Sequence, residues 1–216
     1  MRRRQCEAEA FLGPFVRMCR LGEFEIVKGV IVEEKGVIVA VAGETDADYK
    51  EILKKCNRRT TLGERQVLMP GLVDGHAHAA QHAYCGNGLE LPLLEWLETY
   101  TFKEEAKFQD LDYANAVYER AVSRHLRNGT TTCSYFATIH LAATLALVDI
   151  CARLGQRAHV GKVSMDRNSP DFYIEQDTDR AIADVKTFVD TVENKKKPLL
   201  LRDLREREQQ QQQETW

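Results

Sequence analysis

The chain has 216 residues, of which 44% are hydrophobic, and a formal net charge of −3. These values are typical of a globular protein with one domain or slightly more, and the balanced charge gives no reason to expect a nucleic acid or an anionic membrane as a partner. No apolar run approaches the ~20 residues of a membrane span, and the six cysteines show no pairing motif. We therefore expect a cytoplasmic protein with reduced thiols.

Residues 1–66 predict a small β-rich module. Apolar strands are expected at 11–18, 24–33 and 37–42. Gly36 supplies the flexible backbone that a hairpin turn between the last two strands requires. The polar stretch that follows carries Tyr49, Ile52 and Leu53 at helical spacing.

From Gln66 the pattern changes to alternating strands and helices, which is typical of a parallel sheet. Strands are predicted over 67–73, 130–136 and 157–165, and the segment 198–201 is a candidate fourth strand. Residues 202–216 alternate charges and then carry a run of glutamines. That composition predicts a disordered tail.

Three helices are predicted between and after these strands. Asp110 is placed to cap the first, and Gly129 follows its end. The second runs from Leu141 to Leu154 and is closed by Gly155. Thr178 is placed to cap the third, and the apolar side chains of this helix are expected to face inward: Ile182, Val185, Phe188, Val189 and Val192.

A metal-binding pattern follows the first strand of the alternating region. The apolar run 67–73 is typical of a strand that is buried on both faces, and it leads into His76 and His78. Because alternate side chains of a strand share a face, we expect Asp74, His76 and His78 to point the same way. Two adjacent imidazoles form half of a metal site, most often one for Zn²⁺. An isolated His-x-His often occurs by chance, but its place after a buried-strand signal favours the metal site.

The residues around this motif resemble those of a known protein family. Residues 70–78 resemble the first-strand signature of the amidohydrolase superfamily, metal-dependent hydrolases built on a (β/α)8 barrel. Further segments resemble the guanine deaminases in order and spacing: 78–81, 91–97, 100–102, 128–132, 135–140 and 163–166. The resemblance implies an α/β fold in which residues 67–201 form the first three to four strands of a TIM-type barrel. Residues 1–66 would then be part of the flanking β-sandwich.

The resemblance also implies an activity, the zinc-dependent hydrolytic deamination of guanine to xanthine and ammonia. His76 and His78 would hold the Zn²⁺. Gln81, with Ala80 in the same segment, would line the site for guanine, since an amide both donates and accepts hydrogen bonds. A homodimer is the oligomeric form that members of this family suggest.

Several residues that the family uses are expected later than residue 200. They are two further histidines, a ligand aspartate, a proton-transferring glutamate and a guanine-binding arginine, and no histidine follows His159. We therefore assign no catalytic residue, and we expect the chain to be truncated relative to the family and inactive alone. Two alternatives remain open. One is a related amidohydrolase acting on another heterocycle, and the other is a non-catalytic short form that associates with a full-length partner.

Four other side chains near the motif carry weaker signals. Trp96 is able to stack on a flat ring, although core packing is the commoner role of an aromatic in such a segment. His125 is interpreted as packing on its helix, and His140 follows the second strand at the end where active sites form. Cys85 lies seven residues beyond His78, but the family uses His and Asp as ligands.

Overall fold

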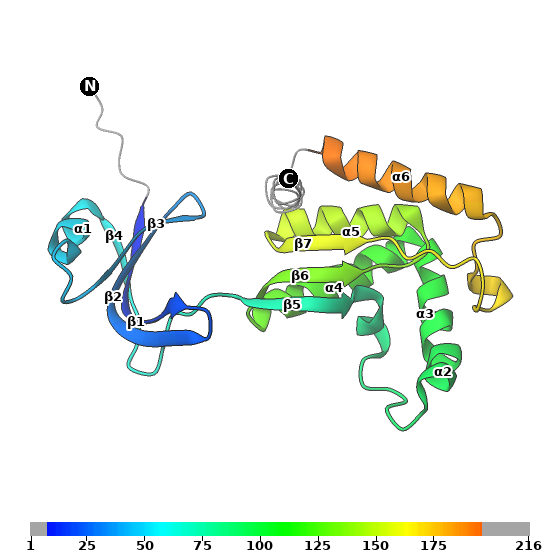
Figure 1. Ribbon diagram of the computed structural model, residues 1–216, viewed down its shortest axis with the longest axis horizontal. Helices are drawn as coiled ribbons and strands as arrows, with labels where there is room; N and C mark the ends of the chain where they lie inside the picture. The colour runs from blue at the N-terminus through cyan, green and yellow to red at the C-terminus, as the bar shows by residue number, and fades with distance from the viewer. Residues whose placement is uncertain (1–7, 196–216) are drawn as a thin grey trace, which may run out of the picture. The chain divides into compact units, whose positions relative to one another are not determined.

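The structure is a computed structural model that describes residues 8–195 (Figure 1). The chain divides after Pro70 into two compact units, each with its own core. Within the described residues, no helix combines the length and the hydropathy needed to cross a bilayer.

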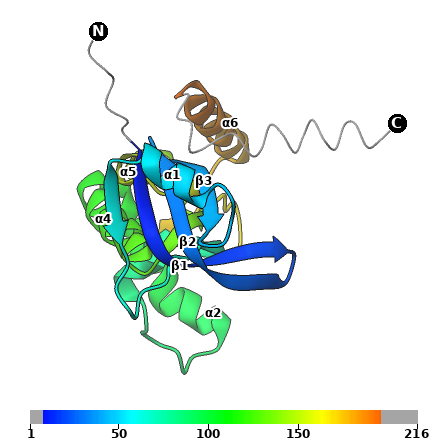
Figure 2. The same cartoon turned by 90° about the vertical axis from the view of Figure 1, so that its left-hand side faces the viewer.

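The first unit is a four-stranded sheet with one helix (Figure 2). The strands are β1 (Glu9–Arg20), β2 (Glu23–Glu34), β3 (Val37–Gly43) and β4 (Arg58–Thr61), in the order β3-β2-β1-β4. β4 runs parallel to β1, and the other pairs are antiparallel. The three expected strands are confirmed, and α1 (Tyr49–Lys55) carries the expected helical positions. Lys35 and Gly36 both have positive φ, as the tight turn between β2 and β3 requires.

The second unit contains a parallel sheet of three strands in the order β5-β6-β7. These strands are β5 (Leu72–His78), β6 (Thr130–Phe136) and β7 (Arg157–Gly161), and the long helices are α4 (Leu111–Arg127), α5 (Leu141–Leu154) and α6 (Thr178–Asn194). Short helices join them: η1 (Ala79–Tyr84), α2 (Leu93–Trp96), the π-helical η2 (Leu97–Thr101), α3 (Phe102–Ala106), η3 (Lys107–Gln109) and η4 (Asp171–Tyr173). The α/β fold with a parallel sheet is confirmed, while the partial TIM-type barrel and the β-sandwich portion stay predictions.

Local signals fix the ends of α4 and α5. The carboxylate of Asp110 accepts hydrogen bonds from the N–H groups of Asp112 and Tyr113, 2.9 and 3.3 Å away. This cap satisfies donors that a helix amino terminus leaves free. Gly129 and Gly155 follow the two helices with φ of 90° and 81°, a conformation that favours glycine.

The first strand of the parallel sheet begins later than the sequence predicts. Residues 67–70 belong to the first unit, where Leu68 exchanges backbone hydrogen bonds with Pro14 and Val16. The predicted strand 67–73 is therefore wrong, and the histidines themselves lie within β5. Val73 is 72% exposed, so this run is not buried on both faces.

The third βα unit also differs from its prediction. β7 ends at Gly161 rather than at residue 165, and the ammonium of Lys162 in the following loop pairs with the Glu175 carboxylate at 2.6 Å. In α6 the capping side chain is Asp177 rather than Thr178. Phe188 is buried as expected, but Ile182 and Val189 are exposed. α6 contacts α5, but fewer of its apolar side chains are buried than the sequence predicts. The candidate strand 198–201 and the tail 202–216 lie outside the described residues.

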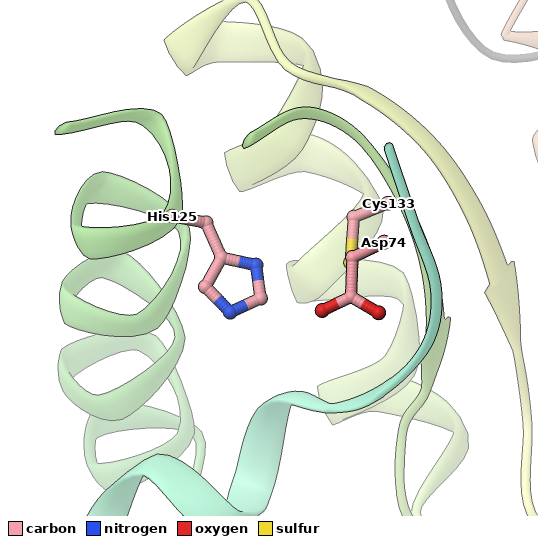
Figure 3. A group of neighbouring side chains, drawn as sticks. All are labelled: Asp74, His125 and Cys133. Carbon is pink, nitrogen blue, oxygen red and sulfur yellow. The ribbon is translucent and has the colours of Figure 1, made fainter. Parts of the chain in front are cut away.

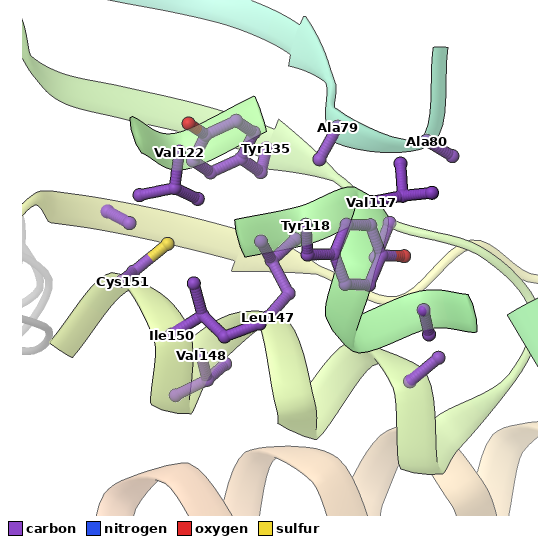
Figure 4. Close-up of a cluster of buried hydrophobic side chains, with 14 of the residues drawn as sticks. Ala79, Ala80, Val117, Tyr118, Val122, Tyr135, Leu147, Val148, Ile150 and Cys151 are labelled. Carbon is purple, nitrogen blue, oxygen red and sulfur yellow. The ribbon is translucent and has the colours of Figure 1, made fainter. Parts of the chain in front are cut away.

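One face of the sheet packs against α4 and α5 to form the core (Figure 4). Tyr135 on β6 enters this core beside Tyr118, Val122 and Leu147, and all four side chains are almost fully buried. Burying a large apolar side chain stabilises a fold by about 1.5–3 kcal/mol. Because neighbours on a strand alternate in direction, the core position of Tyr135 turns Phe136 toward the opposite face of the sheet.

Candidate functional site

The two histidines of the motif converge at the carboxyl end of β5. Their Nε2 atoms lie 3.2 Å apart. Two nitrogens bound to one tetrahedral Zn²⁺ at ~2.0–2.1 Å would be separated by ~3.3–3.4 Å. Burial, followed by the nearby His76, lowers the pKa of His78, which favours the neutral imidazole that metals bind. The pair therefore fits two positions of a tetrahedral metal site.

Asp74 does not share the face of the two histidines, so this prediction is wrong. The pairing of β5 with β6 shifts register between Asp74 and Ala77, and such a bulge reverses the alternation of side chains. Asp74 instead points toward α4, where its carboxylate lies near His125 and Cys133 (Figure 3). Its Oδ1 accepts a hydrogen bond from the backbone N–H of His76 at 3.0 Å.

The ligand-type atoms of Asp74, His125 and Cys133 lie within 4.8 Å of one another. His125 Nδ1 is already 3.0 Å from the Tyr135 hydroxyl, and that hydroxyl donates to Gln156 Oε1 at 2.9 Å. Burial raises the pKa of the Cys133 thiol to about 11, so the thiol is protonated at neutral pH. We assign this cluster to the packing of α4 on the sheet. Sequence reasoning missed it because no local spacing links residues on three separate elements.

A cavity with a volume of about 560 Å³ opens beside the histidine pair. Its lining includes His76, His78, Gln81, Cys85, Trp96 and His125. The structure thus brings Gln81 and both histidines to one cavity. Ala80 is fully buried in the core and does not line this cavity, and its role at the substrate stays a prediction.

An aromatic group forms one side of this cavity. The Trp96 indole N–H donates to the Asn87 carbonyl at 2.9 Å, and its ring lies 5.5 Å from that of Tyr84. Tyr84 in turn stacks on Tyr100 at 6.4 Å. A Cβ at Gly88 would lie 2.4 Å from the Tyr100 ring, so this close approach requires glycine. Trp96 therefore both packs on the protein and faces the cavity.

A second polar group lies at the same end of the sheet. The Tyr173 hydroxyl donates to Glu105 on α3 and accepts from the Ile139 N–H at 3.3 Å. Burial raises the pKa of Glu105 to about 7, although the hydrogen bond from Tyr173 opposes the shift. His140 lies beside Tyr173, with ring centroids 6.0 Å apart, and does not line the cavity of the histidine pair. This group connects α3 to the loops after β6 and β7.

Known protein families and sequences match most of this chain. Residues 67–213 match the model of the Amidohydrolase family. The chain is 42% identical over 203 residues to a guanine deaminase of Dictyostelium discoideum, covering 88% of this chain and 45% of that protein. It is also 42% identical over 187 residues to a human guanine deaminase, covering 84% of this chain and 41% of that protein.

Solved structures give the same relationship. The crystal structure of guanine deaminase from C. acetobutylicum with bound guanine in the active site superposes with a TM-score of 0.79 at 33% identity. The match covers 89% of this chain and 44% of that chain. The chain thus spans somewhat less than half the length of the curated relatives it matches. Because the family model matches more than half of its length, the chain belongs to the amidohydrolase family.

Proposed function

We propose that this chain supplies two metal ligands and part of the substrate site of a zinc-dependent guanine deaminase, which hydrolyses guanine to xanthine and ammonia. The observation that carries the proposal is the convergence of the His76 and His78 Nε2 atoms, 3.2 Å apart, at a cavity that Gln81 also lines. The guanine deaminases among its relatives, one of them with guanine in the active site, support the substrate.

The metal is assigned from the residues present. Neutral imidazole suits Zn²⁺, and members of the family are typically metal-dependent. When bound, Zn²⁺ lowers the pKa of a water molecule to about 7 and so provides a nucleophile at neutral pH. His76 and His78 would hold the ion at the end of β5. The Asp74 carboxylate, which accepts from the backbone N–H of His76, would hold the backbone of that ligand in place.

The substrate is assigned to the cavity beside the pair. Gln81 presents an amide that both donates and accepts, which matches the mixed polar edge of a purine base. Trp96 presents an indole whose N–H is already satisfied by Asn87, so its ring is held in place to border a flat heterocycle. The cavity of about 560 Å³ is within the usual range of small-molecule sites, ~300–1,000 Å³.

Ammonia release with added zinc tests the proposal. The substrates would be guanine, a triazine, a pterin and cytosine, each given to the chain alone and to a form extended to the length of its relatives. We expect the extended form to deaminate guanine in preference to the others, and the His76→Ala and His78→Ala variants to lose this activity. Preference for another ring would identify a related amidohydrolase instead.

The same assay tests whether the chain alone is active or only the extended form. We propose that the chain alone is inactive, because two histidines leave a metal without the remaining protein ligands. The homodimer stays a prediction, which light scattering of the extended form would test. Turnover by the chain alone that depends on His76 would contradict the proposed inactivity.

A further inference from the structure

Phe136 ends β6 and lies against both histidines of the pair. Its ring centroid is 4.6 Å from that of His76, with the planes tilted by 42°, and 5.1 Å from that of His78, with the planes 19° apart. Residues 78 and 136 are partners in the β5–β6 pairing. One aromatic side chain therefore contacts both imidazoles.

The direction of Phe136 is set by its neighbour on the strand. Tyr135 is buried in the core on the helix side of the sheet, and its hydroxyl donates to Gln156 Oε1 at 2.9 Å. β6 is also paired on both sides, with β5 and with β7. The backbone of residue 136 is thus fixed while its side chain, 38% exposed, contributes little to the core.

We propose that Phe136 is a positioning residue for the metal pair, which holds the two imidazoles so that their Nε2 atoms converge. This inference rests on the proposed metal role of His76 and His78. Each imidazole has two rotatable side-chain bonds, and the Phe136 ring, stacked on His78 and tilted against His76, reduces the orientations that they sample without a metal. Less conformational freedom is then lost when an ion binds, so the metal binds more tightly.

Titration of the 216-residue chain with Zn²⁺ against a competing chelator tests this role without any substrate. We expect Phe136→Leu to weaken zinc binding by about tenfold, within the ~10–100-fold loss seen when a residue supporting a metal ligand is removed. Phe136→Tyr keeps the ring and should bind as the wild type does. Phe24→Leu, at a 66% exposed strand position of the first unit, is the matched control and should change nothing.

Two further measurements keep the test decisive. Phe136→Met keeps most of the volume without a ring, and it should lose zinc affinity as Phe136→Leu does even if the leucine variant folds poorly. Without metal, the NMR signals of the two imidazole rings should show rotamer averaging in the methionine variant and not in the wild type. Zinc affinity within twofold of wild type in both variants would overturn the positioning role alone. Zinc binding that survives His76→Ala together with His78→Ala would overturn the ligand assignment as well.

Discussion

The Asp74 carboxylate accepts a hydrogen bond from the backbone N–H of His76 at 3.0 Å, across the bulge where β5 reverses its side-chain alternation. This bond connects the Asp74 side chain, which lies on the helix side of the sheet, to the backbone of His76, a proposed metal ligand. Asp74 therefore contacts the backbone of His76, and it also lines the cavity beside the histidine pair.

The first prediction follows from that bond. Asp74→Ala should lower the free energy of unfolding by about 1–2 kcal/mol, since a backbone donor loses its acceptor, and should weaken zinc binding. Asp74→Asn keeps an oxygen in the same position and should lose much less of both. Urea unfolding followed by circular dichroism, together with zinc titration, would measure the two effects. Equal loss of zinc affinity in both variants would instead mark Asp74 as a direct ligand.

The second prediction concerns Gln81 and the proposed substrate. In a form extended to the length of the relatives, Gln81→Ala should lower kcat/KM for guanine by ~10–100-fold, because a base edge left unpaired in a closed site costs ~1–3 kcal/mol. Gln109→Ala makes the same change at an exposed position away from the cavity and is the control. An unchanged kcat/KM in the Gln81 variant would remove this residue from the site.

A third expectation concerns the buried hydroxyl of Tyr135. Tyr135→Phe removes the donor to Gln156 Oε1 and the partner of His125 Nδ1. The unfolding free energy should fall by about 1–3 kcal/mol, because the buried Gln156 Oε1 keeps only the weak Cys151 thiol donor at 3.9 Å and the partly buried His125 Nδ1 loses the tyrosine hydroxyl. Tyr49→Phe, in the helix of the first unit, should have little effect. Equal stability of the Tyr135 variant and the wild type in urea would show that the polar cluster around this hydroxyl is dispensable.

The fourth prediction is a pH dependence from Glu105. Burial raises its folded pKa to about 7, above the value of ~4.3 in an unfolded chain. The neutral acid is favoured in the folded state. Its stabilisation is therefore complete below pH ~4 and is lost as the pH rises through ~7, by about 4 kcal/mol in all. Glu105→Gln should remove this dependence, as unfolding curves from pH 4 to pH 8 would show.

Glu104 provides the control for that experiment because its shift has the opposite sign. Burial acts to raise the pKa of Glu104, but hydrogen bonds from Lys107 and Tyr113 lower it overall. Its contribution is therefore present above its unfolded pKa and lost as the pH falls. The Glu104→Gln variant should change the pH profile in the reverse direction. Parallel profiles for the two variants would contradict the assignment of Glu105.

The sequence alone determined the features that local chemistry specifies. The bounds of β6 and α5 agree with those predicted, because β-branched residues in the strand and the glycine that closes the helix act within a few residues of their own positions. The carboxylate of Asp110 caps α4, which is likewise a local contact. The histidine pair was also predictable, since residues two apart on a strand share a face.

Only the tertiary structure decided what depends on pairing between distant segments. The bulge that turns Asp74 toward His125 arises from the register of β5 on β6, which no local pattern encodes. The start of β5 depends on Leu68 pairing with β1 in the first unit. The contact of Phe136 with both imidazoles likewise brings together strands that are more than 50 residues apart in the chain. Backbone hydrogen bonds and packing between such segments form only in the folded chain, so the sequence specifies the ligands while the fold sets their orientation.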